Sequence, residues 1–358
     1  MARLTDIAWE DFRELPLEAK KPYLENGGIP NTPYHTLFAQ QFDRNLLERL
    51  AALANRIRFM AKSKEGALYL KSLLPHKRAM LYFSQPSSRT FLSHLAACQI
   101  LGLTTGSVRD AAISSEFKGE TKEDSIRTFS SYFDVIIMRS QEKGLAEHMA
   151  WELSNSDRPI PIINAGSGKD QHPTQALLDV YTLLRSFEKK GGLRNRTVTF
   201  CGDLLRGRTV RSLSYLLTNF ENIRQVFVAP PQLQVPEDVL DILKAKGVSF
   251  ATSDNLREAV SLSDAVYMTR IQDEWDQSKG ESAKIDTHLF KFGAEELKLL
   301  PPDGVILHPL PRRDEIALCC DRDPRAMYWR QMRNGMWIRS ALIAMTFGFE
   351  KQIMCFGA

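Results

Sequence analysis

The sequence contains no long uninterrupted apolar run. Its 358 residues include no stretch of about 18 apolar residues, the length from which a helix becomes a candidate for crossing a bilayer. The first residues carry early acidic side chains (Asp6, Glu10 and Asp11) and no apolar core, so we expect no secretory signal peptide there. These absences predict a cytoplasmic chain without a membrane partner.

Cysteine is scarce, and its spacing fits no metal or redox motif. The chain has 5 cysteines, an odd number, and they are Cys98, Cys201, Cys319, Cys320 and Cys355. No pair has the spacing of a zinc knuckle or of a redox motif, so we expect free thiols in a reducing compartment. Because no other cluster of Cys, His, Asp or Glu has metal-ligand spacing, we expect no bound metal and no cofactor.

The sequence also lacks a strong excess of one charge and the common nucleotide-binding motifs. The net charge is only +4, and no dense block of Lys and Arg occurs, so a nucleic-acid partner is not expected. Neither Gly-x-Gly-x-x-Gly nor Gly-x-x-x-x-Gly-Lys-Ser/Thr is present. This argues against a nicotinamide-dependent dehydrogenase and against a nucleoside triphosphatase.

What the sequence does contain is a regular alternation of short apolar strands and helices. Strands are expected at 79–83, 135–138, 160–164, 197–200, 226–228, 265–268 and 304–307, and helices at 43–62, 90–101, 174–187 and 328–350. Such alternation is typical of parallel sheets covered on both faces. The expected fold class is α/β, with two doubly wound parallel-sheet domains, a cleft between them, and a C-terminal helix that returns to the first domain.

The length is too great for one ordinary hydrophobic core, which also favours two domains. Residues 1–36 mix Pro, Gly and charge without a sustained period, so we expect an irregular N-terminal extension with room for one short helix. The first domain is expected over 37–172, completed by 327–358, and the second over 173–326.

Polar residues follow the expected strands, where ligands of doubly wound sheets bind. Ser87, Ser88, Arg89 and Thr90 open the helix after the first strand. Hydroxyls, a guanidinium and the N–H groups of a helix start together suit a phosphate, although a simple helix cap has the same composition. Arg139 ends the second strand, where a guanidinium is costly unless it faces an anion.

Further polar residues follow later strands in both halves of the chain. His172 and Gln175 stand at the entry to the helix expected over 174–187, and Arg208, Arg270 and Gln272 follow strands of the second half. A lone histidine is more often structural, but a His-Pro-x-Gln run at a strand-to-helix junction favours a ligand. Arginines after strands in both halves indicate substrates that carry several negative charges.

Six groups of residues are similar, in the same order, to motifs of the aspartate/ornithine carbamoyltransferase family, and the resemblance covers about residues 40–350. They are Ser87-Ser88-Arg89-Thr90, His172 through Asp179, Gly202-Asp203 through Gly207-Arg208-Thr209-Val210, Tyr267-Met268-Thr269-Arg270, His308-Pro309-Leu310-Pro311-Arg312, and Tyr328 through Gly335. Three features favour the aspartate branch: His-Pro-Thr-Gln in place of His-Pro-Cys-Gln, His-Pro-Leu-Pro in place of Cys-Leu-Pro, and no Ser-Met-Gly near 260–275.

The resemblance implies transfer of the carbamoyl group of carbamoyl phosphate to the amine of L-aspartate, a step of de novo pyrimidine biosynthesis. It implies that 37–172 with 327–358 binds carbamoyl phosphate and that 173–326 binds aspartate. It also implies a homotrimer with shared active sites, in which Ser114 and Lys118 reach into the neighbouring subunit. A regulatory chain or a larger pathway assembly is left open.

The resemblance also assigns a role to each candidate residue. The implied catalytic residues are Arg89, Thr90, Arg139, His172 and Gln175. Carbamoyl phosphate is expected to bind Ser87, Ser88, Arg89, Thr90, Arg139, His172, Gln175, Leu310 and Pro311, with Ser114 and Lys118 of the adjacent subunit. Aspartate is expected to bind Lys118, Arg208, Arg270 and Gln272.

The sequence departs from the family pattern at several positions, and two other functions stay open. Phe91 replaces an arginine, Ser88 a threonine, Phe117 a lysine, and His94-Leu95 a Phe-Glu pair. One alternative is a transferase that acts on ornithine or an acylated ornithine, although Arg270 would repel an ammonium group. The other alternative is a non-catalytic relative that keeps the fold as a binding or scaffold subunit.

Overall fold

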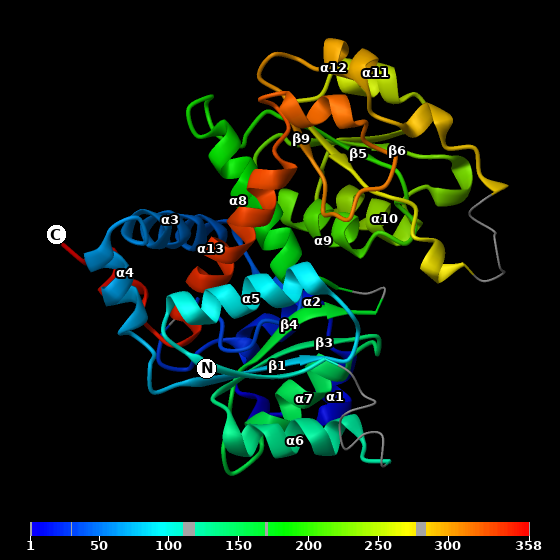
Figure 1. Cartoon of the computed structure of the whole chain (residues 1–358). Helices are drawn as coiled ribbons and strands as arrows, with labels where there is room; N and C mark the ends of the chain where they lie inside the picture. Colours follow the sequence, from blue (N-terminus) through cyan, green and yellow to red (C-terminus); the bar gives the residue numbers. More distant parts are fainter. Residues whose placement is uncertain (1, 30, 110–118, 169–170, 277–283, 358) are drawn as a thin grey trace. The chain divides into compact units, whose positions relative to one another are not determined.

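The computed structural model describes residues 2–29, 31–109, 119–168, 171–276 and 284–357. It confirms an α/β fold built on two parallel sheets (Figure 1). The chain divides into two compact units, Met1–Leu177 with Gly335–Ala358, and Leu178–Asn334. The C-terminal helix therefore returns to the first unit, as the sequence predicts. Ser114 and Lys118 lie outside the described residues.

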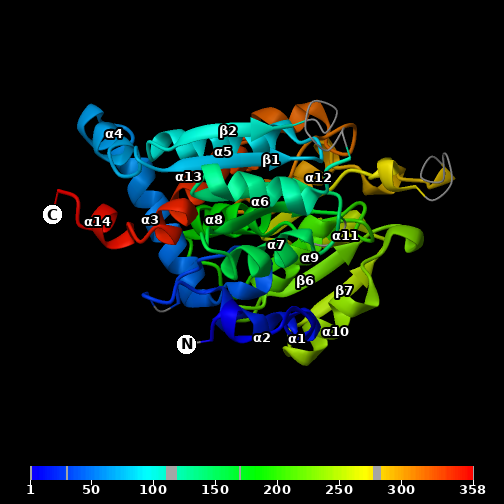
Figure 2. The same cartoon turned by 90° about the horizontal axis from the view of Figure 1, so that it is seen from below.

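The first unit contains a four-stranded sheet in the order β2-β1-β3-β4. Its strands are β1 (Arg78–Phe83), β2 (Thr104–Val108), β3 (Val135–Ser140) and β4 (Ile162–Ser167). Its helices include α3 (Arg44–Met60), α4 (Lys64–Lys71), α5 (Ser88–Ile100), α6 (Lys122–Tyr132), α7 (Leu145–Ser154) and α14 (Glu350–Met354). Helix α5 covers one face of the sheet and α6 and α7 cover the other (Figure 1), while α14 lies beside α3 (Figure 2).

The second unit contains a five-stranded parallel sheet in the order β7-β6-β5-β8-β9. Its strands are β5 (Thr197–Cys201), β6 (Arg224–Val228), β7 (Phe250–Ser253), β8 (Ala265–Met268) and β9 (Val305–Leu307). Helices α9 (Arg208–Leu217) and α10 (Glu237–Ala245) cover one face, and α11 (Leu256–Ser261) and α12 (Ala294–Leu299) cover the other. The chain passes from one unit to the other within α8 (Pro173–Phe187) and within α13 (Tyr328–Thr346).

Both sheets reverse their direction of growth at one place. In the first sheet the chain adds β2 on one side of β1 and then adds β3 and β4 on the other side. In the second sheet β6 and β7 lie on one side of β5, and β8 and β9 lie on the other. Loops that leave neighbouring strands in opposite directions open a crevice at the carboxyl ends of those strands. The carboxyl ends of β1 and β3, and those of β5 and β8, are therefore the expected ligand sites.

The strand expectations are confirmed in position, and their boundaries differ at the carboxyl ends. β3 and β4 extend two and three residues farther than expected, to Ser140 and Ser167, so Arg139 lies inside a strand and not after it. The sequence reading gave no strand at 104–108 or at 250–253. These edge strands are only partly buried, so they lack the apolar run that marks the inner strands. The helix expected over 328–350 ends at Thr346.

The N-terminal segment is more regular than the expected irregular extension. It forms four short helices: η1 (Leu4–Asp6), α1 (Trp9–Glu14), α2 (Leu17–Lys20) and η2 (Lys21–Leu24). Leu4, Phe12 and Leu24 belong to the same core cluster as buried residues of α7. The buried Lys20 ammonium pairs with the Glu147 carboxylate of α7 at 2.5 Å, so the segment is an integral part of the first unit.

The buried His35 side chain makes stability depend on pH. Its Nδ1 accepts a hydrogen bond from the Ile162 N–H at 3.1 Å, and its Nε2 lies 3.0 Å from the Ser154 hydroxyl. Burial lowers the pKa of His35 from 6.5 to about 3. The folded state therefore keeps a neutral ring over a range in which the unfolded chain takes up a proton. The contribution of His35 to the free energy of unfolding is therefore fully present above pH 6.5, and it is lost as the pH falls toward 3.

We expect His35 to remove about 1.4 kcal/mol of stability for each pH unit below 6.5, or about 2.7 kcal/mol at about pH 4.5. Urea unfolding should be followed across this range for the wild type and for His35→Asn. The asparagine oxygen retains an acceptor for the Ile162 N–H and does not titrate. The difference in stability between the two proteins should shrink as the pH falls, and parallel pH profiles would contradict the prediction.

Candidate active site

The first predicted cluster lies where α5 begins, directly after β1. Ser87 occupies the N-cap position of α5, yet its side chain accepts no capping hydrogen bond from the described residues of the helix. The alternative reading of this motif as a simple helix cap therefore does not describe Ser87. Thr90, one turn into the helix, is only 7% exposed. Together the helix start and the hydroxyls have the character of an anion site.

Arg139 lies on β3, which neighbours β1 at the point where the sheet reverses. Its side chain is buried, and its Nη1 donates to the Ala165 carbonyl oxygen at 3.1 Å. The loop after β1 is fastened to the same residue, because the Ser84 hydroxyl donates to the Arg139 carbonyl oxygen at 3.3 Å. A buried guanidinium held at the carboxyl end of an inner strand is suited to a small anion that reaches it from the loops.

Gly166 brings two of the predicted residues together. Its φ is +124°, and a Cβ added here would lie 2.5 Å from Arg139 Nη1 and 3.4 Å from His172 Cδ2. A side chain at position 166 would therefore displace the guanidinium and crowd the imidazole. Gln175 follows in the first turn of α8, where its N–H donates to the His172 carbonyl oxygen at 3.0 Å. The structure thus places Arg139, His172 and Gln175 in one region of the first unit.

Two buried residues of this region were not among the predicted site residues. Arg339 of α13 is 3% exposed and donates to the hydroxyls of Ser93 and Thr174. His94 donates through Nδ1 to the Thr90 carbonyl oxygen at 2.9 Å. Burial, together with the charge of Arg339, holds the pKa of His94 well below its usual range, so the ring is neutral. Arg339 could have been recognised in the sequence, because it is a charged residue within the apolar run of 338–346.

Phe91, which departs from the family pattern, has a packing role in this structure. It is 6% exposed, and its ring meets the Phe83 ring edge to face with a centroid distance of 5.4 Å. The Arg109 guanidinium lies 4.4 Å from the centroid of the Phe91 ring. The arginine usual at this position would remove an apolar ring from the contact between α5 and the end of β1.

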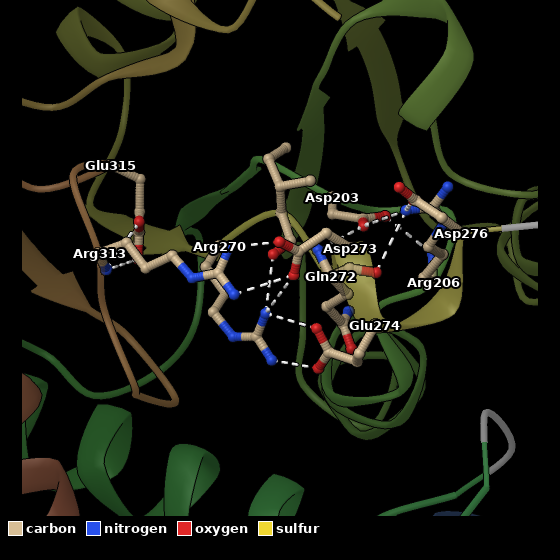
Figure 3. Close-up of polar contacts among 10 residues, drawn as sticks. Asp203, Arg206, Arg270, Gln272, Asp273, Glu274, Asp276, Arg313 and Glu315 are labelled. Carbon is tan, nitrogen blue, oxygen red and sulfur yellow. Dashed lines mark hydrogen bonds and ion pairs between the residues drawn. The ribbon is translucent and has the colours of Figure 1, made fainter. Parts of the chain in front are cut away.

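In the second unit, Asp203 fastens the loop after β5 to the loop after β8 (Figure 3). One carboxylate oxygen accepts from the Arg206 N–H and the other from the Gln272 N–H, both at 3.0 Å. The Arg206 guanidinium donates to the Asp276 carboxylate at 2.9 Å. Asp203 is fully buried, and burial raises its pKa. Gln272 therefore has a fixed backbone position at the second sheet reversal.

Arg270 already faces a carboxylate in this structure. Its guanidinium donates to both carboxylate oxygens of Glu274, with Nη1 2.8 Å from Oε2, and it lies 3.8 Å from Asp273 (Figure 3). Arg313 donates two hydrogen bonds of 2.8 and 2.9 Å to the Asp273 carboxylate. These bonds lower the pKa of Asp273 to about 2. Arg208, the first residue of α9, has a pKa lowered to about 10 by burial, an effect that the Glu274 charge opposes.

The two predicted arginines of the second unit, Arg208 and Arg270, therefore both interact electrostatically with Glu274. The sequence reading did not include Glu274. Glu274 could have been recognised from its position, because it lies four residues after Arg270 in a loop that follows a strand. An arginine pair that shares one carboxylate is chemically suited to an acidic ligand, and a cationic ligand would be repelled.

The loop after β9 contains Leu310 and Pro311, whose carbonyl groups are candidates for a ligand amide. The Leu310–Pro311 peptide bond is cis, and Leu310 has a φ of +54°. A non-glycine residue in the left-handed region costs about 1–3 kcal/mol and is kept where the surroundings determine it.

Over the described ranges, no group of three or more His, Cys, Asp and Glu side chains is arranged to hold a metal ion. No helix among the same residues is long and apolar enough to cross a membrane.

The chain is similar to known proteins along most of its length. Residues 34–185 match the family described as aspartate/ornithine carbamoyltransferase, carbamoyl-P binding domain, and residues 194–346 match its Asp/Orn binding domain. The chain is 41% identical over 310 residues to the chloroplastic aspartate carbamoyltransferase of Oryza sativa subsp. japonica. The aligned region covers 85% of this chain and 82% of that protein. It is 37% identical over 314 residues to multifunctional protein pyr1-3 of Dictyostelium discoideum, which covers 88% of this chain and 13% of that protein.

A solved structure shares the fold at a similar level of identity. It is aspartate transcarbamoylase from Trypanosoma cruzi in complex with carbamoyl phosphate and aspartate. The TM-score is 0.76 and the sequence identity 37%, over 86% of this chain and 94% of that chain.

Proposed function

The chain belongs to the aspartate/ornithine carbamoyltransferase family, and we propose that it carbamoylates the amine of L-aspartate with carbamoyl phosphate, giving N-carbamoyl-L-aspartate and phosphate. The observation that carries the choice of acceptor is the double hydrogen bond between Arg270 and the Glu274 carboxylate. A guanidinium that engages a carboxylate in this way suits the side chain of aspartate, whereas the ammonium of ornithine would be repelled.

Carbamoyl phosphate binds the first unit in this proposal. Its phosphate lies at the start of α5 and is held by Ser87, Ser88, Arg89, Thr90 and Arg139, with Ser114 and Lys118 supplied by a neighbouring subunit. The dipole and the N–H groups of the helix start favour the phosphate charge. Gln175 and the carbonyl groups of Leu310 and Pro311 orient the carbamoyl amide.

Aspartate binds through the arginines of the second unit. Arg208 holds the α-carboxylate, and Arg270 with Gln272 holds the β-carboxylate. Lys118 of the neighbouring subunit adds a further positive charge. The Asp203 bridge supports this assignment, because it fixes the Gln272 backbone against the loop that leads to Arg208.

The amine of aspartate then attacks the carbonyl carbon of carbamoyl phosphate, and the tetrahedral intermediate collapses with loss of phosphate. Thr90, Arg139 and His172 donate hydrogen bonds to the developing oxyanion. The departing phosphate accepts the proton of the amine, so this scheme needs no protein base. Holding the two anionic substrates in register contributes up to about 7–11 kcal/mol.

The assembly and location are part of the same proposal. We propose a homotrimer with shared active sites in the cytoplasm, acting in pyrimidine biosynthesis. The multifunctional name of the Dictyostelium relative is compatible with a pathway partner. A mass of one chain in sedimentation at micromolar concentration would contradict the trimer.

Purified protein should carbamoylate L-aspartate and leave L-ornithine unchanged when the two acceptors are assayed in parallel. Activity with ornithine alone, or with an acylated ornithine, would mean that the second unit has been misassigned. Binding of carbamoyl phosphate without turnover of either acceptor would favour the non-catalytic alternative.

A further inference from the structure

The His308 side chain is buried directly behind the Leu310–Pro311 loop. It is fully buried, and its Nδ1 accepts a hydrogen bond from the Leu310 N–H at 2.8 Å. Its Nε2 lies 2.6 Å from the Glu315 carboxylate. Since Nδ1 is an acceptor, the ring proton must be on Nε2, where it is donated to Glu315. The imidazole therefore joins a backbone N–H to a buried carboxylate in one defined tautomer.

The same carboxylate fastens the other end of the loop. Both oxygens of Glu315 lie within hydrogen-bond distance of the Arg313 N–H, at 3.2 and 3.0 Å. The Leu310 N–H and the Arg313 N–H are thus fixed by a single His308–Glu315 pair. Between these two N–H groups lie the carbonyl groups of Leu310 and Pro311. The directions of those carbonyls depend on a loop that is held at both of its ends.

The pair is itself held from behind by other buried groups of the second unit. The Gln331 side-chain oxygen accepts from the His308 N–H at 2.9 Å. The Gln331 amide donates to Asp179 at 2.6 Å, and the Tyr267 hydroxyl donates to the other Asp179 oxygen at 2.8 Å. Residues from α13, α8 and β8 therefore fix the backbone of His308 at the base of the loop, and Glu315 holds its ring.

We propose that His308 is a positioning residue for carbamoyl transfer, which sets the Leu310 and Pro311 carbonyls by accepting the Leu310 N–H. This inference rests on the proposed function, because that proposal assigns these carbonyls to the carbamoyl amide. His308 itself does not touch the substrate. It acts through one hydrogen bond, and the left-handed conformation of Leu310 is the backbone state that this bond selects.

Two substitutions separate the two hydrogen bonds of the ring. His308→Asn places an oxygen near the position of Nδ1, so it retains the acceptor for Leu310 and loses the donor to Glu315. His308→Gln places an amide near the position of Nε2, so it retains the donor and loses the acceptor. We expect His308→Gln to lower kcat/KM for carbamoyl phosphate about 100-fold, the effect of a misplacement of about 1 Å. His308→Asn should retain activity within about tenfold of the wild type.

A second measurement reports the hydrogen bond without requiring activity. Pro309 and Pro311 carry no N–H, so Leu310 supplies the one backbone amide between His308 and Arg312. Hydrogen exchange of a peptide that spans these residues should show a protected amide in the wild type and in His308→Asn. The amide should exchange rapidly in His308→Gln.

His35 provides the matched control, because it is also buried, also accepts a backbone N–H through Nδ1, and also contacts a side chain through Nε2. His35→Gln should lower stability and leave KM for carbamoyl phosphate unchanged. Equal losses of activity in both His308 variants, or rapid exchange of Leu310 in the wild type, would overturn the inference. A wild-type protein that protects Leu310 but carbamoylates no acceptor would instead contradict the proposed function.

Discussion

Replacing Arg139 by alanine should lower kcat for aspartate carbamoylation about 10²–10³-fold, the effect of removing one donor to a developing oxyanion. The guanidinium is buried at the carboxyl end of β3, is fixed by the Ala165 carbonyl and approaches the backbone of Gly166. Removing it takes away the donor to the Ala165 carbonyl and a positive charge beside Gly166, which His172 also approaches. Steady-state kinetics with both substrates varied would measure the loss.

Arg78 offers a control on the same sheet. It begins β1 at the opposite, amino-terminal edge and pairs with Asp134 at 3.5 Å with its side chain half exposed. Arg78→Ala should change kcat by less than about twofold, because exposed ion pairs contribute little. If both variants lost the same activity, the effect of Arg139 would be one of general stability and the catalytic assignment would fail.

Replacing Arg270 by alanine should lower kcat/KM for aspartate about 10²–10⁴-fold, with a much smaller effect on KM for carbamoyl phosphate. Two charged hydrogen bonds to one carboxylate contribute about 3–6 kcal/mol together. Arg270→Lys should recover only part of this loss, because an ammonium keeps the charge without the planar fork. Initial rates over a wide range of aspartate concentrations would provide the test.

Arg313 is the matched control for Arg270. It pairs with Asp273 through two hydrogen bonds in the same region (Figure 3), but more than half of its side chain is exposed. Arg313→Ala should leave KM for aspartate within about threefold of the wild type. Near-normal aspartate kinetics in Arg270→Ala would remove Arg270 from the binding site and weaken the preference for an acidic acceptor.

The sequence predicted the parts of the fold that depend on local apolar runs. The inner strands β3 and β8 are buried along their whole length, and β1 is buried after Arg78, so most of their residues are apolar and their positions could be recognised. Arg139, His172, Arg208 and Arg270 were predicted as site residues because each parallel sheet brings the carboxyl ends of its strands to one side. This rule needs only the order of strands and helices along the chain.

Partners that are distant in the sequence could not be predicted in the same way. Arg339 meets Ser93 across 246 residues, and Asp203 accepts from Gln272 across 69. No local period indicates such pairs, because each depends on how the chain turns between them. The same reason applies to residues 2–24, whose apolar side chains follow no sustained period in the sequence and pack into a core with residues of α7.

The return of the chain to its first unit has a consequence for the order of folding during synthesis. Arg339 and the rest of α13 beyond Asn334 are added only after the whole second unit, Leu178–Asn334, has been made. At about 5–20 residues per second, the 246 residues that separate Ser93 from Arg339 take about 12–50 s. The first unit is therefore begun first and completed last. During that interval Ser93 of α5 lacks its hydrogen bond from Arg339.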